Sequence, residues 1–412
     1  MRMAPGPTTG DGDRRRRREG TEVQGSILFN GNIERETDFI QRFKDRILTS
    51  RHQDAAVRGS RKVLMVTAAW KKDEYNEGHV RAALNAIGIP SRYEAGYDQN
   101  IQNLAVYHGF NSLKQKEPEL YAKYHEKQEV IKGVKQFYRK KNTQLVALLK
   151  DQKELIQRTF PGTTLAQVLN YPVQATRKDL PSLSPRQLHF HYCCQDVQGT
   201  LRAIVQNDEK MVEICSEIDL YFAASSGLAA NATYREMRAR LVERILSANS
   251  IFIFGGHVAI LYNRLNFFKL KEAFVEALRR GTNFYTISAG TGVLCNRIIL
   301  YDDFGEDRHV ARDFEFFDNG FGIVTKIQVF PHCMDRIKTD DPDNLAYLAH
   351  RFESSCCLGM NQESFLLMET VADGADATRE RFVSMGEKDA VWVFDKTGRK
   401  TPKGNGEELA LS

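Results

Sequence analysis

The sequence predicts an α/β fold, a three-layer domain with a mostly parallel sheet that is interrupted by an inserted helical subdomain. Three observations support this class. Short apolar runs of strand length alternate with helical patterns, which is typical of a parallel sheet covered by helices on both faces. A long polar stretch with apolar residues at helical spacing separates two groups of these units. The strand-length runs end in small residues, at the sheet edge where such folds bind ligands.

These patterns divide the chain into three parts. Residues 1–25 are rich in Gly, Pro, Thr and Arg, and we expect them to form a disordered basic tail. Residues 26–104 and 229–412 are expected to build the α/β domain. Residues 105–228 are expected to form the helical insertion.

The net charge of +5 is matched by five consecutive arginines at positions 14–18. The rest of the chain is close to neutral, which argues against a nucleic-acid or membrane surface. We interpret the arginine run as a solvated tail, with a polyanion-binding arm as the less favoured alternative. No apolar run approaches the roughly 18 residues that span a bilayer. The first 25 residues lack the apolar core of a secretory signal, so we expect a cytoplasmic protein.

The first β-α-β unit begins at Lys62. Residues 62–70 form an apolar run that ends in small residues, as a parallel strand buried on both faces does. A short helix is expected over residues 79–87, because Gly88 and a following proline close the pattern. Residues 91–95 are the candidate for the next strand.

The helical insertion has two parts. Residues 111–158 are rich in Lys, Glu and Gln and carry apolar residues at helical spacing, which predicts a pair of long helices or an antiparallel hairpin. The helical pattern returns over residues 185–222 after several prolines. Because apolar stripes must be buried, we expect the insertion to pack mainly as its own subdomain. We also expect part of it to mediate self-association or to bind a partner protein.

Alternating elements resume after the insertion. Helices are expected over residues 234–248 and 270–280, and strands over residues 250–256 and 283–288. The first of these strands ends in Gly255-Gly256 and the second ends in a serine. Because the carboxyl ends of parallel strands share one edge of the sheet, these two ends are expected to lie close together.

Ser288 is the candidate nucleophile, because Ser288-Ala289-Gly290 follows a strand and precedes a predicted helix. Such a turn exposes the hydroxyl, and the helix N-terminus favours developing negative charge. A serine needs a base to remove its proton, and His332 follows an apolar run over residues 322–330. The alternative is a core serine with two small neighbours, which the upstream Gly-Gly and the downstream histidine disfavour.

The seven cysteines include the adjacent pairs Cys193-Cys194 and Cys356-Cys357, and no CxxC pair occurs. This pattern suits neither a disulfide framework nor a structural zinc site, so we expect reduced thiols. His189 and His191 lie near the first pair, but their spacing fits no standard tetrahedral site. The sequence therefore implies no metal and no cofactor.

These motifs resemble the peptidase E and cyanophycinase serine hydrolases, which share the class I glutamine amidotransferase-like fold. The resemblance covers residues 62–97 and about 229–400. Residues 248–256 resemble the strand that ends in the family's Gly-Gly loop, and residues 281–291 resemble its nucleophile turn. Phe330-Pro331-His332 resembles its histidine strand.

The resemblance implies a serine-dependent hydrolase that cleaves a peptide or isopeptide-like amide bond. Ser288 would be the nucleophile and His332 the general base. In peptidase E an acid fifteen residues after the serine completes the triad, and that position is Asp303 here. Asp302 and Glu306 are close alternatives.

The resemblance also implies an oxyanion hole, formed by the backbone N–H groups of Gly256 and Ala289. The family usually has Asn or Asp after the Gly-Gly, where this chain has His257. An acidic pair of the cyanophycinase branch is replaced here by Asn361-Gln362, so an aspartyl or β-aspartyl substrate is only one option. The candidate substrate-binding residues are His257, Arg336, Asn361 and Gln362.

Two other function classes remain open at this point. The fold could be catalytically silent and act as a ligand-sensing or protein-interaction module through the helical insertion. An amidotransferase-like domain is disfavoured, because the turn holds a serine where those enzymes use a cysteine.

Overall fold

The computed structural model describes six stretches of the chain, residues 24–91, 100–173, 182–300, 315–372, 378–386 and 391–411. The predicted tail therefore lies almost wholly outside the described residues, as does the arginine run within it. Residues 92–95 of the candidate second strand also lie outside them.

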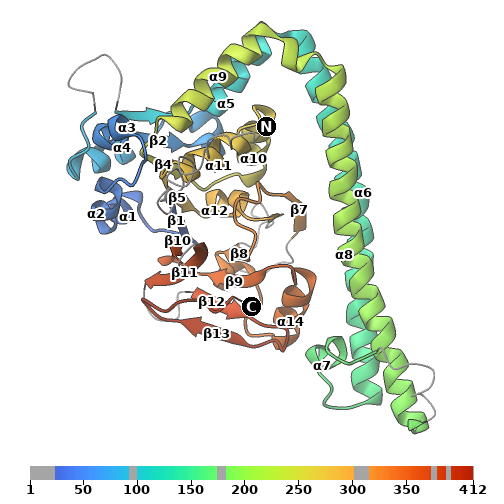
Figure 1. Ribbon diagram of the computed structural model, residues 1–412. Coiled ribbons are helices and arrows are strands. Elements are labelled where there is room, and N and C mark those ends of the chain that lie inside the picture. Colours follow the sequence, from blue (N-terminus) through green and yellow to red (C-terminus); the bar gives the residue numbers. More distant parts are fainter. Residues whose placement is uncertain are drawn as a thin grey trace, which may run out of the picture.

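A seven-stranded sheet forms the centre of the molecule (Figure 1), with the order β11-β10-β1-β5-β4-β2-β3. The five strands from β1 to β3 in this order are parallel, and β10 and β11 add an antiparallel edge. Their bounds are β1 (Ser26–Asn30), β2 (Val63–Val66), β3 (Ile101–Asn103), β4 (Ser250–Ile253), β5 (Asn283–Ile287), β10 (Ser364–Ala372) and β11 (Thr378–Gly386). The mixed α/β class with a mostly parallel central sheet is thus confirmed.

Helices cover both faces of this sheet, because successive strand side chains point to opposite sides. Met65 and Phe252 lie on the face covered by α1, α2 and α4. Leu64 and Ile251 lie on the face covered by α5 and α9 to α12. The bounds are α1 (Glu36–Arg42), α2 (Lys44–Leu48), α3 (Ala55–Ser60), α4 (Gly78–Ala86), α5 (Val106–Lys116), α9 (Ala232–Leu246), α10 (Val258–Phe267), α11 (Lys271–Arg279) and α12 (Ala289–Leu294).

The C-terminal part builds a separate four-stranded sheet, with the order β13-β12-β9-β8. The sequence does not predict this separate sheet. Because β8 belongs to it, the strand before His332 lies outside the central sheet. A two-stranded ribbon of β6 and β7 lies between the sheets and the long helices (Figure 1). The bounds are β6 (Arg297–Leu300), β7 (Glu315–Asn319), β8 (Ile327–Pro331), β9 (Cys356–Met360), β12 (Val391–Phe394), β13 (Lys400–Lys403), α13 (Cys333–Arg336) and α14 (Pro342–Arg351).

The insertion is dominated by two very long antiparallel helices, α6 (Pro118–Thr159) and α8 (Pro185–Ser225), with the short α7 (Leu165–Leu169) near their far end (Figure 1). We call α6 and α8 the long hairpin. The prediction of two helices or a hairpin within residues 111–158 is wrong, because α6 runs unbroken for 42 residues and pairs with α8 instead. Pro118 starts α6, and no further proline interrupts it.

The long hairpin also packs against the rest of the chain. Ile131 and Leu149 of α6 share an apolar cluster with Leu345 and Leu348 of α14. The buried Asp208 on α8 pairs with Arg351 of α14 at 2.8 Å. No helix in the described part of the chain is long and apolar enough to cross a membrane.

Candidate active site

Ser288 occupies a strained turn between β5 and α12. Its backbone angles are φ 48° and ψ −108°, a conformation that non-glycine residues rarely adopt. The end of β1 supports this turn, because Ser288 donates its backbone N–H to the carbonyl of Asn30 at 3.0 Å. The buried Thr291 hydroxyl donates to the same carbonyl at 2.9 Å and lies 2.9 Å from the Thr286 hydroxyl. These bonds hold the serine turn in place.

Two glycines allow the close packing around this turn. A Cβ atom at Gly290 would lie 2.1 Å from the carbonyl oxygen of Ile253, so only glycine lets α12 approach the end of β4. Gly256 has φ 127°, and a Cβ atom there would lie 2.9 Å from the carbonyl oxygen of Ala69. A Cβ atom at Gly255 would lie 3.0 Å from Ser288 Cβ, so the Gly-Gly loop lies beside the serine turn, as expected from their places at adjacent strand ends.

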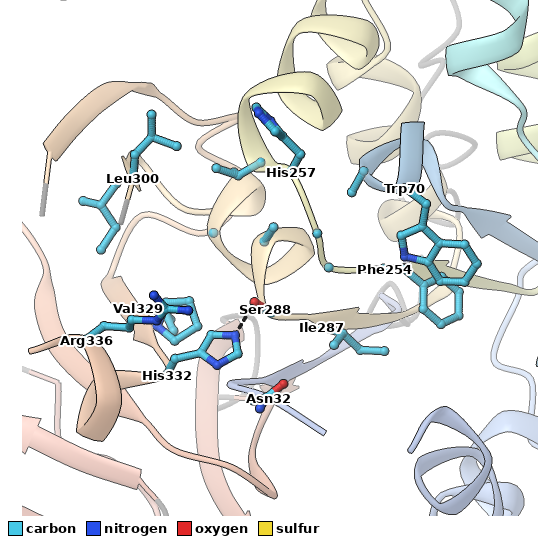
Figure 2. Close-up of a pocket in the computed structure, with 18 of the residues that line it drawn as sticks. Asn32, Trp70, Phe254, His257, Ile287, Ser288, Leu300, Val329, His332 and Arg336 are labelled. Atoms are coloured by element: carbon cyan, nitrogen blue, oxygen red, sulfur yellow. Dashed lines mark hydrogen bonds between the residues drawn. The ribbon is translucent and has the colours of Figure 1, made fainter. Parts of the chain in front are cut away.

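His332 reaches the serine from the second sheet. It follows β8 and has a left-handed backbone, with φ 54° and ψ 35°. Its Nε2 atom lies 2.8 Å from Ser288 Oγ, which is hydrogen-bond distance (Figure 2). The structure therefore brings the predicted serine and histidine together at the junction of the two sheets.

Asn361 supports the turn that carries His332. Its Oδ1 atom accepts hydrogen bonds from the Cys333 thiol at 2.8 Å and from the Met334 backbone N–H at 3.2 Å. Asn361 is buried, and neither it nor Gln362 lines the cavity at Ser288. The structure thus places Asn361 behind the histidine turn, whereas Gln362 is exposed and forms a backbone bridge with Asn32, which lines the cavity.

A cavity of about 780 Å³ opens above Ser288 and His332. One wall is apolar and includes Trp70, Phe254 and Ile287 (Figure 2). The Trp70 and Phe254 rings pack with their centroids 5.3 Å apart. A cavity of this size takes a small molecule or a few residues of a peptide.

The charged side chains of the described lining are mostly basic. Arg139, Arg297, Arg336 and Lys71 line the cavity, whereas Glu36 is the single carboxylate among the described lining residues. Arg336 lies beside His332 (Figure 2). This balance of charge favours an anionic ligand.

Arg139 was not predicted from the sequence, because it lies on α6, far along the chain from the serine and histidine. Its only sequence signal is membership in a Lys/Arg-rich stretch of the helix, which equally suits a solvated face. Its presence in the cavity lining shows that the long hairpin contributes to the site.

The candidate acids Asp302, Asp303 and Glu306 lie outside the described residues. The described chain stops at Leu300, the last residue of β6, and Leu300 itself lines the cavity (Figure 2). Glu36, the one carboxylate in the described lining, lies with its Oε2 atom 3.6 Å from His79 Nε2.

His257 has a second role besides lining the cavity. Its Nδ1 atom accepts a hydrogen bond from the Ile260 backbone N–H at 3.3 Å, which caps the start of α10. The described residues contain no group of three His, Cys, Asp or Glu side chains that could hold a metal ion. Burial raises the pKa of the Cys333 thiol, so the cysteine beside His332 is poorly suited to act as a nucleophile.

A strained serine turn, a histidine at hydrogen-bond distance and a Gly-Gly loop define the class of site, that of an α/β serine hydrolase. The model of peptidase family S51 matches residues 221–371, which include both Ser288 and His332. We therefore identify this part of the chain with peptidase family S51, and the predicted resemblance to peptidase E and cyanophycinase is confirmed.

Two further comparisons complete this result. No curated protein sequence matches the chain. The chain is similar to a solved structure described as the crystal structure of a peptidase from an acI-B1 Actinobacterium, with 15% sequence identity and a TM-score of 0.45. That similarity covers 94% of this chain and 98% of the other.

Proposed function

We propose that this protein is a serine peptidase that cleaves a peptide or isopeptide-like amide bond, with an α/β part of the class I glutamine amidotransferase-like type. The observation that carries the proposal is the 2.8 Å contact between Ser288 Oγ and His332 Nε2 at a strained strand-to-helix turn. Asp303 is proposed as the acid that orients His332, on the basis of its spacing from the serine.

The proposed reaction has two stages. Ser288 Oγ attacks the carbonyl carbon of the substrate while its proton passes to His332 Nε2. The backbone N–H groups of Gly256 and Ala289 stabilise the oxyanion, and His332 then gives the proton to the leaving amine. Water, activated by His332, hydrolyses the acyl-enzyme and regenerates the serine.

The substrate is proposed to carry a carboxylate near the scissile bond, as an aspartyl or β-aspartyl compound does. The basic wall formed by Arg139, Arg297 and Arg336 supports this choice, because guanidinium groups bind carboxylates well. The opposite apolar wall at Trp70 suits a hydrophobic portion of the substrate.

Hydrolysis of matched dipeptides tests both parts of the proposal. Release of free amine would be measured for Asp-Leu, β-Asp-Leu and Asn-Leu, with the Ser288→Ala variant as the chemical control. We expect the acidic substrates to be cleaved faster, and Ser288→Ala to lower kcat by at least about a thousandfold.

The Arg336→Gln variant separates recognition from chemistry. It should lower kcat/KM for the acidic dipeptides by about tenfold to a hundredfold, the value of one charged hydrogen bond, and should affect Asn-Leu much less. Arg235→Gln, at an exposed position on α9, is the matched control. Cleavage that survives Ser288→Ala would refute the serine mechanism, and equal losses on acidic and neutral substrates would refute the role of Arg336.

A further inference from the structure

The outward face of α6 carries an apolar stripe. Val130, Phe137, Leu148 and Leu155 are each between 45% and 65% exposed. They follow one another at intervals of seven, eleven and seven residues. At about 100° per residue, these intervals return each side chain to within about 20° of the first, so the four form one line along the helix.

This stripe points away from the rest of the molecule. Lys135 and Lys153 mark the inner side of α6, because they pair with Asp318 of β7 and Asp343 near the start of α14. On a helix these lysines lie roughly 150° around from the stripe. Figure 1 shows the long hairpin as one flank of the molecule, with both sheets on its inner side.

The stripe has the same spacing in both directions along the helix. A two-fold axis perpendicular to α6, placed midway between Phe137 and Leu148, sets Phe137 opposite Leu148 of an antiparallel second copy. The same axis sets Val130 opposite Leu155 of that copy. A face that matches itself in this way is what a two-fold dimer interface requires.

The outer side of α8 shows the same symmetry about the same level of the long hairpin. Tyr192 and Tyr221 are 48% and 74% exposed, and the residues midway between them are Gln206 and Asn207. Asn207 donates a hydrogen bond to Asn142 of α6 at 3.0 Å, and Asn142 is the midpoint of the α6 stripe. One two-fold axis at this level therefore sets α6 opposite α6, and α8 opposite α8, of a second copy.

We propose that two copies of this chain associate through the outward faces of their long hairpins, as an antiparallel four-helix arrangement with α6 on α6 and α8 on α8. The stripe spans about 38 Å at 1.5 Å per residue. A contact of that length and two helices wide buries on the order of 1,500 Å² in total, which is the usual size of a specific interface.

The charges near this interface include one pair that favours a second copy and one pair that opposes it. The proposed axis brings Glu126 of one copy next to Arg158 of the other, twice in the dimer, which favours self-association. It also sets Asp196 opposite Glu217, a like-charge pair that makes the dimer weaker than its apolar area alone implies.

Sedimentation equilibrium of the full chain tests the proposal. At tens of micromolar we expect about twice the chain mass of 47.0 kDa. The Phe137→Glu/Leu148→Glu variant should sediment as a monomer with an unchanged circular dichroism spectrum. Val275→Glu, at a 43% exposed position on α11, should remain a dimer. A monomeric wild type, or a dimer that the double variant leaves intact, would overturn the proposal.

Cysteine cross-linking tests the register without relying on mass. When Phe137→Cys and Leu148→Cys chains are mixed and oxidised, peptide mapping should show a 137–148 disulfide between chains. Phe137→Cys alone should give no 137–137 link, because the two positions lie about 16 Å apart along the antiparallel pair. A 137–137 disulfide, or no 137–148 disulfide in a proven dimer, would contradict the proposed axis.

Discussion

Replacing Asp208 by alanine should loosen the long hairpin from α14. The Asp208 and Arg351 side chains are only 10% and 6% exposed, and they form two hydrogen bonds of 2.8 and 2.9 Å. Asp208 also accepts a hydrogen bond from Asn142 at 2.7 Å. The contact is therefore a buried ion pair between the middle of the long hairpin and α14.

The size of the effect follows from what the substitution leaves behind. Asp208→Ala removes the carboxylate but keeps the Arg351 guanidinium buried, with Tyr347 Oη as a neutral acceptor at 2.8 Å. Breaking a buried pair on one side costs about 3–5 kcal/mol of unfolding free energy. That is a large part of the roughly 5–15 kcal/mol that folds a typical domain. Replacing both partners by apolar residues, as in Asp208→Leu/Arg351→Met, should restore most of the loss.

Urea denaturation followed by circular dichroism measures these free energies. Glu213→Ala is the matched control, because Glu213 pairs with Lys210 on the same helix with both side chains more than half exposed. This control should be indistinguishable from wild type. An Asp208→Ala variant as stable as the Glu213→Ala variant would refute a stabilising role for the buried pair between the long hairpin and α14.

Three further predictions concern the sheet and the serine turn. Burial alone would raise the pKa of the Glu369 carboxyl, but a hydrogen bond from Arg381 and the charges of Arg46 and Arg51 hold that pKa below its usual range. The Glu369 carboxylate therefore stabilises the fold at neutral pH, and this stabilisation is lost as the pH falls through the lowered pKa. Glu369→Gln should be less stable than wild type at pH 7 and approach the wild-type stability below about pH 4 in denaturation series. Gly290→Ala should lower both stability and kcat/KM because of the contact with the Ile253 carbonyl, whereas Gly292→Ala, whose new Cβ meets nothing within 4 Å, should unfold at the wild-type temperature or above. Thr291→Val removes three buried hydrogen bonds, two of them to the Asn30 backbone, and should cost about 1–3 kcal/mol, measured by thermal unfolding; a cost near zero would mean that this network does not hold the turn.

The order of strands and helices around Ser288 was predictable, because apolar runs and small residues alternate clearly from residue 234 onward. β1 was not identified, although it lies between β5 and β10 in the central sheet. Its five residues follow directly on the polar tail, and so short a run lacks the flanking pattern that distinguishes a strand. The single unbroken helix α6 was not predicted, because helical periodicity alone does not show where one helix ends.

The serine and histidine could be found from the sequence because each directly follows an apolar run that predicts a strand. Their meeting across two sheets depends on long-range packing and leaves no local signal. The same holds for Arg139, which reaches the cavity only because α6 docks along the molecule. Asn361 was expected at the substrate, but the structure uses its side chain to hold the turn after His332.

Labelling with a fluorophosphonate tests the central claim, that His332 activates Ser288 as a nucleophile. In the expected reaction Ser288 Oγ forms a bond to phosphorus, fluoride leaves, and the hydroxyl proton passes to His332. Intact-mass spectrometry and peptide mapping of wild type should show one adduct, located on Ser288. Ser288→Ala should remain unlabelled, and His332→Gln should label at least about a hundredfold more slowly. A folded wild-type protein that resists the reagent, or an adduct on any other residue, would contradict the account.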